Sequence, residues 1–324
     1  MKVAVYYNNN DVRIEERPIP KINEGEILVK VKACGICGTD VMEWYRIKKA
    51  PRVLGHEMAG EIAESRSKLY KKGQRVFVSH HVPCNKCKYC LDGNHTACET
   101  LHTGNYDPGG FSEYVRVPKI NVENGTYLLP DNVSYEEGTM IEPLACCVRA
   151  QRVIGLKEGH LIWIPGSGVS GLMNIQLAKI NKAKVIATDI NEYRLKKALE
   201  SGADKVINAK EKLDFKADRI IMCTGAMPAF EQAFKLIDRK GIILLFAIPN
   251  KDVILPTCDF WRNEMTIMSS YGAAPVDLEE SLRLIKDKKV NMKTLISHRF
   301  ELEDIQEGFK IASDAKDSLK IIIV

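Results

Sequence analysis

The sequence lacks any long hydrophobic run. Its longest apolar stretches, such as Ile242–Ile248, are far shorter than the roughly 20 residues needed to span a bilayer. The N-terminal stretch MKVAVYYNNN alternates and then becomes polar, without the apolar segment and small-residue cleavage site of a secretory leader. We therefore predict a cytoplasmic protein with no membrane segment.

An excess of one charge, internal repeats and low-complexity segments are also absent. The 47 basic and 42 acidic residues are mixed along the chain, and basic runs such as Lys71–Lys72 and Lys286–Lys289 are short. Short runs of this kind are typical of solvated surfaces, so we predict no nucleic-acid partner. With 324 residues, 45% of them hydrophobic, the chain has enough apolar material for two cores, and two soluble domains are expected.

Cysteines, in contrast, are concentrated in one turn-rich run, PCNKCKYCLDGNHTAC, which has too few apolar residues to form a core of its own. Four thiolates at this spacing can close around one tetrahedral zinc ion and leave no open position. Two disulfides are the alternative, but ten cysteines without a leader favour a reducing compartment. We predict a structural zinc site at Cys84, Cys87, Cys90 and Cys98.

The character of the chain changes near residue 143. Residues 1–143 are rich in glycine, proline and short alternating stretches, which predicts a β-rich domain. From residue 144, continuous apolar strands alternate with helical patterns, as in 161–165, 171–183, 191–203 and 229–240. This alternation predicts an α/β domain with a doubly wound parallel sheet covered on both faces. The tail from residue 273 has two helical patterns and a terminal strand, and its pattern does not assign it to either domain.

A glycine-rich loop, GSGVSG (166–171, with Val169 at its fourth position), follows directly after the strand pattern LIWIP and stands at the start of a helical pattern, where Val169 is also expected to contact the cofactor. In this context Gly166 permits the tight turn, Gly168 permits close approach of a pyrophosphate, and Gly171 permits close packing of helix on strand. The loop therefore predicts a dinucleotide-binding site.

The next strand pattern ends at Asp189, at the offset expected of a carboxylate that binds the ribose of a dinucleotide. Such a carboxylate repels a 2′-phosphate, so NAD is favoured over NADP. Arg194 is close enough in sequence to bind the cofactor and to help tolerate NADP. The alternative for Asp189 is that it caps the following helix.

Cys37, His56 and Glu57 suggest a second zinc of a different kind. One thiolate, one imidazole and a carboxylate are too few to close the coordination sphere, which is typical of a catalytic zinc that acts as a Lewis acid on substrate oxygen. His56 taken alone could be a core or turn histidine, and Cys34 with Cys37 could form a redox pair. We expect Cys34 to be packed and Cys37 to be a ligand.

Together these motifs resemble the zinc-dependent medium-chain dehydrogenases, in the branch that contains sorbitol (polyol) and threonine dehydrogenases. The motifs are GICGTD (35–40), GHE (55–57), the cysteine lobe (84–98), EPL (142–144) and GSGVSG (166–171). The resemblance implies a GroES-like catalytic domain over 1–143 and 273–324 with two zinc ions, and a Rossmann NAD-binding domain over 144–272. It also implies an active site in the cleft between the domains and assembly as a homodimer or homotetramer.

The resemblance also implies roles for single residues. It places the catalytic zinc at Cys37, His56 and Glu57, with Glu142 binding this zinc or holding its water. Thr39 falls where the family has a hydroxyl residue that touches the substrate alcohol and takes the first step of proton relay.

The chain departs from the family at two positions. Met42 stands where many relatives have a histidine that continues the proton relay, and Arg149 stands where relatives often have histidine. We expect Trp44, Tyr45 and Arg46 to shape the substrate pocket.

The predicted function is transfer of a hydride from a polyol, sugar or secondary alcohol to NAD, as an NAD(P)-dependent dehydrogenase of CH–OH donors (EC 1.1.1.-). L-Threonine 3-dehydrogenase activity is the alternative in the same chemical class. A noncatalytic protein that binds zinc and nucleotide is the alternative of another class, and it would need only the four-cysteine lobe.

Overall fold

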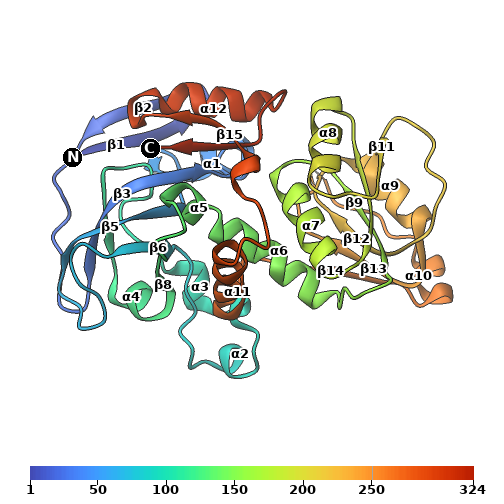
Figure 1. Ribbon diagram of the computed structural model, residues 1–324, viewed down its shortest axis with the longest axis horizontal. Helices are drawn as coiled ribbons and strands as arrows, with labels where there is room; N and C mark the ends of the chain where they lie inside the picture. The colour runs from blue at the N-terminus through green and yellow to red at the C-terminus, as the bar shows by residue number, and fades with distance from the viewer. Residues whose placement is uncertain (250) are drawn as a thin grey trace. The chain divides into compact units, whose positions relative to one another are not determined.

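The computed structural model describes residues 1–249 and 251–324, which form two compact units (Figure 1). Unit 1 comprises residues 1–143 and 272–324, and unit 2 comprises residues 144–271. The C-terminal tail, which its sequence pattern left unassigned, is part of unit 1. The assignment of the units as a catalytic and an NAD-binding domain stays a prediction.

Unit 1 is β-rich, as predicted for its first 143 residues. A seven-stranded sheet has the order β15-β16-β3-β5-β6-β8 with β7 also paired to β3, and a second sheet has the order β2-β1-β4. Its strands are β1 (Lys2–Asn8), β2 (Asp11–Glu16), β3 (Ile27–Ile36), β4 (Arg52–Val53), β5 (Glu57–Ser65), β6 (Arg75–Ser79), β7 (Tyr114–Val117), β8 (Thr126–Leu128), β15 (Ile296–Phe300) and β16 (Lys320–Ile323).

Short helices connect these strands, and the tail adds two longer ones. Helix α12 packs on β2, β3, β15 and β16, so the C-terminal segment closes one side of the unit 1 core. The helices are α1 (Glu43–Arg46), η1 (Ile47–Lys49), α2 (Lys88–Leu91), η2 (His95–Ala97), α3 (Glu99–Thr103), α4 (Lys119–Gly125), α5 (Tyr135–Thr139), α11 (Pro275–Lys286), η3 (Lys293–Leu295), η4 (Leu302–Asp304) and α12 (Ile305–Asp314). Helix α6 (Ile141–Val153) begins in unit 1 and continues into unit 2.

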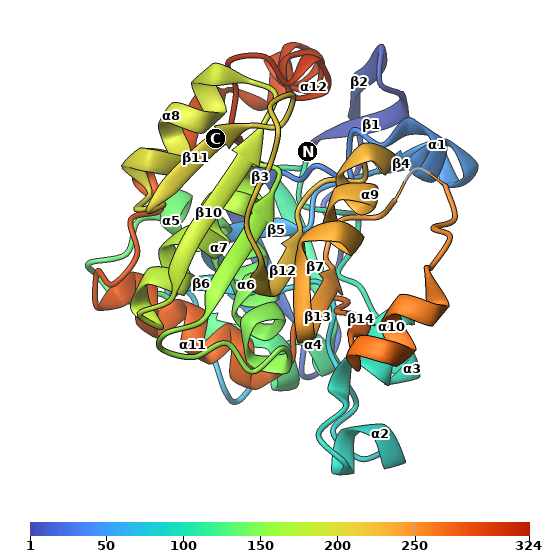
Figure 2. The same cartoon turned by 90° about the vertical axis from the view of Figure 1, so that its right-hand side faces the viewer.

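Unit 2 is the predicted parallel α/β domain (Figure 2). All strand pairs of its six-stranded sheet, ordered β11-β10-β9-β12-β13-β14, are parallel. The strands are β9 (Leu161–Pro165), β10 (Lys184–Asp189), β11 (Lys205–Asn208), β12 (Ala217–Met222), β13 (Ile237–Leu245) and β14 (Thr266–Ser269). The central strand β9 (LIWIP) is apolar along its whole length, because helices cover both faces of the sheet.

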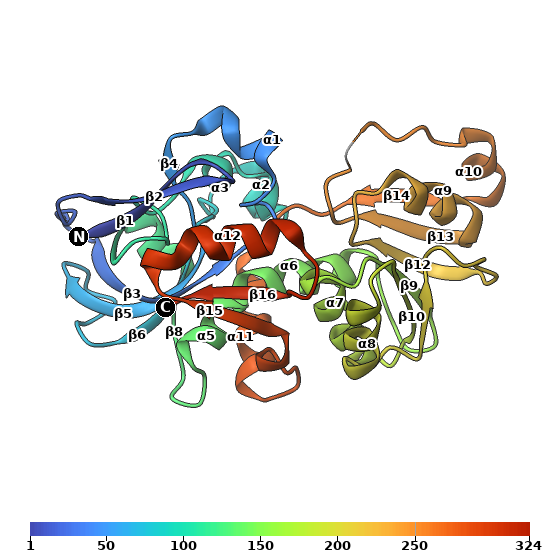
Figure 3. The ribbon, with the colours of Figure 1, turned by 90° about the horizontal axis from the view of Figure 1, so that it is seen from above.

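Helices α7 (Val169–Ile180) and α8 (Glu192–Glu200) lie on one face of this sheet, and α9 (Met227–Leu236) lies on the other (Figure 3). The core under α9 includes Trp163 of β9 and Phe230 of α9. The helical pattern predicted over 229–240 ends at Leu236, because Ile237 already pairs with Ala217 as part of β13.

Three elements had no clear signal in the sequence: α10 (Thr257–Asn263), the edge strand β14, and β15 of the tail. The apolar run Ile242–Ile248 overlaps β13, which is flanked by β12 and β14. No described helix is long and apolar enough to cross a membrane.

Candidate metal centres and cofactor site

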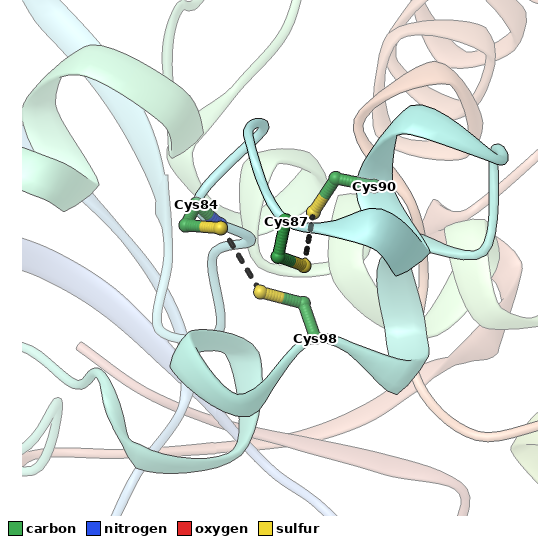
Figure 4. A group of neighbouring side chains, drawn as sticks. All are labelled: Cys84, Cys87, Cys90 and Cys98. Atoms are coloured by element: carbon green, nitrogen blue, oxygen red, sulfur yellow. Dashed lines mark hydrogen bonds between the residues drawn. The ribbon is translucent and has the colours of Figure 1, made fainter.

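The four-cysteine lobe lies between β6 and β7, where short helical turns project from the sheet of unit 1 (Figure 1). The four Sγ atoms of Cys84, Cys87, Cys90 and Cys98 all lie within 4.8 Å of one another and converge on a common centre (Figure 4). All ten cysteines are free thiols, so the disulfide alternative is wrong. The apolar cluster here consists of Cys90, Cys98 and Leu101, with Cys84 and Cys87 against it, which is too small to hold the lobe by packing.

The protonation of these thiols is uneven. Burial and a hydrogen bond with Cys87 raise the pKa of Cys90 to about 12. Burial acts in the same direction on Cys98, but backbone N–H groups of Cys84 and Leu101 outweigh it and lower the pKa of Cys98 to about 6. Four thiolates this close repel one another unless they share a cation. A tetrahedral zinc ion fits this donor set.

A second group brings together Cys37, His56 and Glu57, with one possible ligand atom from each lying within 4.8 Å of the others. Cys37 follows the last residue of β3, and Glu57 is the first residue of β5. Because β3 and β5 pair antiparallel with Gly35 opposite Glu57, the two ends meet at one edge of the sheet. This pairing explains how Cys37 and Glu57, 20 positions apart in the sequence, come to lie in one site.

The Asp40 side chain holds both Cys37 and His56 in position. Its carboxylate is fully buried, accepts the Cys37 N–H at 3.1 Å, and lies 3.5 Å from Nδ1 of His56. Burial lowers the pKa of His56, but the charges of Asp40 and Cys37 outweigh burial and raise it well above its usual value. A histidine that faces a carboxylate through one ring nitrogen and keeps the other for a metal is typical of zinc sites. The motif GICGTD contains Asp40, but sequence reasoning did not assign it a role.

The hydroxyl of Thr39 lies beside the sulfur of Cys37. Its Oγ1 donates to Cys37 Sγ at 3.3 Å and accepts a hydrogen bond from Nη2 of Arg46 at 2.8 Å. Arg46 also donates from Nε to the Thr39 carbonyl at 2.9 Å and from Nη2 to Asp40 at 3.2 Å. Arg46 therefore fixes the loop that carries Thr39, a role that its sequence pattern alone did not reveal.

Glu57 forms a buried ion pair with Lys320 of the C-terminal strand. Lys320 Nζ lies 2.8 Å and 2.5 Å from the two carboxylate oxygens and also donates to the Ile36 carbonyl at 3.2 Å. Both side chains are almost inaccessible to solvent. Burial lowers the pKa of Lys320, but the charge of Glu57 outweighs burial and raises it. Glu57 thus faces the metal group while both of its oxygens already accept hydrogen bonds.

Gly35 provides the space for this ion pair. A Cβ atom at position 35 would lie 2.2 Å from Oε2 of Glu57, far closer than Cβ atoms approach non-bonded neighbours in proteins. Lys320 could have been noticed in the sequence, because it is the one charged residue of the apolar strand KIII. A lysine buried in such a strand requires a partner.

Glu142 lies in the first turn of α6 and is not part of the group formed by Cys37, His56 and Glu57. Its charge helps to raise the pKa of Lys320 and that of the buried Tyr106, whose pKa is raised chiefly by burial. The predicted role of Glu142 at the zinc stays a prediction.

In unit 2, the glycine loop has the geometry that the sequence predicted. Gly166 has a φ of +93°, and a Cβ atom there would lie 2.7 Å from the Cys223 carbonyl oxygen. A Cβ atom on Gly171 would lie 1.9 Å from the Gly166 carbonyl oxygen, whereas one on Gly168 would meet no atom within 4 Å. Gly168 caps α7 and leaves open space at the helix N-terminus, as the approach of a pyrophosphate requires.

Asp189 ends β10 and holds this loop. It accepts the Ser167 N–H at 2.8 Å and the Asn191 N–H at 3.0 Å. The cap of α8 is Asn191, so the alternative that Asp189 caps this helix is wrong. Ser167 Oγ and Arg194 Nε are buried and have no hydrogen-bond partner among the described residues. Buried polar atoms of this kind fit a site that a dinucleotide completes.

Known proteins match the chain along its whole length. Residues 23–127 match the family described as the alcohol dehydrogenase GroES-like domain, and residues 170–287 match the family described as zinc-binding dehydrogenase. A sorbitol dehydrogenase of Halalkalibacterium halodurans is 31% identical over 99% of this chain and 98% of its own. An L-threonine 3-dehydrogenase of Bacillus licheniformis is 32% identical over 91% of this chain and 90% of its own.

Among solved structures, 2R,3R-butanediol dehydrogenase of Bacillus subtilis superposes with a TM-score of 0.87 at 28% identity, covering 99% of both chains. An alcohol dehydrogenase of Escherichia coli, solved with NADH, superposes with a TM-score of 0.90 at 28% identity, covering 100% of this chain and 99% of its own.

Replacement of one thiol should empty the predicted structural site. We expect Cys98→Ser to lower the zinc content from about two to about one ion per chain, because three thiolates no longer close the tetrahedron. The melting temperature should fall with it. Elemental analysis and thermal unfolding measure both, with Cys258→Ser, an exposed thiol, as the matched control. Equal zinc content in the two variants would rule out a four-cysteine site.

Removal of Lys320 should leave a buried carboxylate without its partner. We expect Lys320→Met to lower the free energy of unfolding by about 3–5 kcal/mol. Adding Glu57→Gln to this variant should restore part of the loss, because the uncompensated charge is removed. Urea unfolding measures the effect, and Lys310→Met, on an exposed lysine of α12, is the control. If Lys320→Met were as stable as the control, the ion pair would contribute nothing.

Proposed function

The chain belongs to the zinc-dependent medium-chain alcohol dehydrogenases and is an NAD(P)-dependent oxidoreductase of alcohols or polyols, and we propose how its residues carry out this reaction. The substrate is a secondary alcohol or polyol whose hydride passes to NAD. The observation that carries this proposal is the convergence of Cys37, His56 and Glu57 within 4.8 Å, with the Thr39 hydroxyl 3.3 Å from the Cys37 sulfur. A thiolate, an imidazole and a hydroxyl meet here as metal-assisted alcohol oxidation requires.

Cys37 and His56 would hold the catalytic zinc, with Glu57 or Glu142 beside them, and the four-cysteine lobe would hold the structural zinc. When bound, zinc acts as a Lewis acid on the alcohol oxygen, and the nicotinamide accepts the hydride. Asp40 orients His56 and balances its charge. Thr39 would accept the proton of the substrate hydroxyl, and Arg46 holds the Thr39 side chain in place for this task.

Beyond Thr39, the relay differs from that of many relatives. Met42 caps the N-terminus of α1 and offers no group that carries a proton. Arg46 keeps its proton at any ordinary pH, so it donates a hydrogen bond but does not pass a proton on. We propose that water takes the proton from Thr39.

We propose NAD as the preferred cofactor, with Gly166, Gly168, Val169 and Gly171 around the pyrophosphate. Asp189 accepts two backbone N–H groups and retains lone pairs for ribose hydroxyls. The negative charge of Asp189 would repel the 2′-phosphate of NADP. Arg194 would lie near the bound cofactor.

Threonine is the second candidate substrate, and it rests on the 32% identity with an L-threonine 3-dehydrogenase. The alternative of a noncatalytic protein is not favoured, because dehydrogenases match the chain over more than 90% of its length.

We propose that the protein assembles as a homodimer or homotetramer in the cytoplasm. Edge strand β14 is paired only with β13 in the described sheet, and in the segment that precedes it Ile254 and Trp261 are 90% and 84% exposed. Such apolar exposure beside an open sheet edge favours association. The free state of all ten cysteines supports a reducing compartment.

The reaction is tested by the formation of NADH from NAD and a panel of alcohols, with the zinc-loaded protein. We expect turnover of at least one polyol, secondary alcohol or threonine. Thr39→Val should lower kcat by about 10²–10⁴-fold, because general-base assistance is lost, while NADH affinity is unchanged. Thr39→Ser retains the hydroxyl and should retain activity. Equal rates for the valine and serine variants would exclude Thr39 from proton transfer.

The choice of cofactor is tested at Asp189. We expect Asp189→Asn to lower the ratio of kcat/KM for NAD over NADP by about tenfold, since the repulsion of the 2′-phosphate is removed. Asp204→Asn is the matched control, because Asp204 also accepts a backbone N–H, from Val185, in the same unit. An unchanged ratio in Asp189→Asn would mean that this carboxylate does not select the cofactor.

A further inference from the structure

Arg46 lies next to the Thr39 hydroxyl, and a second arginine, Arg52, interacts with Arg46 electrostatically. Arg46 donates from Nε and Nη2 to Thr39 and Asp40, and its Nη1 has no hydrogen-bond partner among the described residues. Its side chain keeps 16% of its surface exposed. Arg52, in β4, is near enough that the charge of Arg46 lowers its pKa, an effect second only to that of burial. The two guanidinium groups therefore share one electrostatic environment.

Arg52 has no anionic partner of its own. Its side chain is partly buried, yet it makes no hydrogen bond or ion pair with any residue that the structure describes. A partly buried guanidinium without a partner is costly, because water is removed from the charge and nothing replaces it. Such a group is typical of a site that an anion completes.

The acidic groups nearby are already engaged. Asp40 is fully buried and faces His56, Arg46 and the Cys37 N–H. Glu43, on the same short helix as Arg46, accepts the Asn9 N–H at 3.0 Å. The carboxylate that pairs with Arg46 is therefore already shared with His56, and a bound zinc would add further positive charge.

Other groups at this place favour a ligand as well. His80, whose ring centre lies 4.8 Å from that of His56, has a buried Nδ1 without a partner among the described residues. Trp44 and Tyr45, next to Arg46 on α1, are 52% and 38% exposed and offer apolar surface. A ligand here could contact the charge of Arg46, the Nδ1 atom of His80 and the exposed aromatic side chains on α1.

We propose that Arg46 and Arg52 form a subsite for an anionic group, a carboxylate or a phosphate, carried by the alcohol substrate. Two guanidinium groups bind either anion through charge-assisted hydrogen bonds. Arg46 contacts Thr39 directly, so an anion held here lies close to the reacting hydroxyl. The inference rests on the proposed function and narrows its substrate class to secondary alcohols that carry a negative charge.

Matched pairs of substrates test the subsite. The pairs are glycerol with glycerol 3-phosphate, and butane-2,3-diol with 3-hydroxybutyrate, so that phosphate and carboxylate are distinguished. We expect kcat/KM for the anionic member of one pair to exceed that of its neutral partner at least about tenfold.

Variants of Arg52 test whether this residue causes the preference for the anionic substrate. Arg52→Gln should remove the preference mainly by raising KM for the anionic member, with kcat for the neutral member nearly unchanged. Arg52→Lys should restore part of it. Arg66→Gln, on an exposed arginine of the same unit, should leave the preference intact.

The outcomes separate this inference from the proposed function. Turnover of neutral alcohols with NAD, without preference for either anionic member, would overturn the subsite and leave the dehydrogenase reaction standing. If no alcohol reacts, isothermal titration of the zinc-loaded protein with inorganic phosphate and with acetate decides. Binding that Arg52→Gln abolishes supports the subsite, whereas no binding, or equal binding by the variant, overturns it.

Discussion

The buried ion pair between Glu57 and Lys320 is the constraint on which the metal-site half of the molecule depends. A carboxylate and an ammonium group are both removed from water here, so neither can move away from the other without a large cost. This requirement fixes the register between β3, β5 and β16 at their common edge. It also excludes any side chain at Gly35. Cys37 and His56 are placed by the ends of the strands that the pair holds together.

Beside this ion pair, the charged side chains of Asp40 and Arg46 hold Thr39 in position. Asp40 lies behind the candidate zinc ligands, and Arg46 lies between Asp40 and Thr39. The loop after β3 is therefore held by hydrogen bonds as well as by the packing of Val41 against the core. Such a loop can place a hydroxyl accurately beside a metal ligand although α1 is only one turn long.

Local spacing allowed the sequence to predict the cysteine lobe, the glycine loop and the parallel sheet, because each depends on residues close together in the chain. Lys320 was missed because its partner is 263 positions away and no local pattern connects them. Arg46 and Asp40 lie inside or beside quoted motifs, but their roles depend on side-chain directions that spacing does not fix. Edge strand β14 and helix α10 were missed because their residues show no clear hydrophobic period.

The discontinuity of unit 1 has a consequence for synthesis on the ribosome. Strand β16, which carries Lys320, pairs with β3 and β15 but follows unit 2 in the sequence. The contiguous segment 144–271 can fold as soon as it emerges, whereas the metal-binding unit must wait, with Glu57 unpaired, until β16 has been synthesised. A nascent chain stalled before β16 would therefore carry a complete parallel sheet and an unfinished metal site.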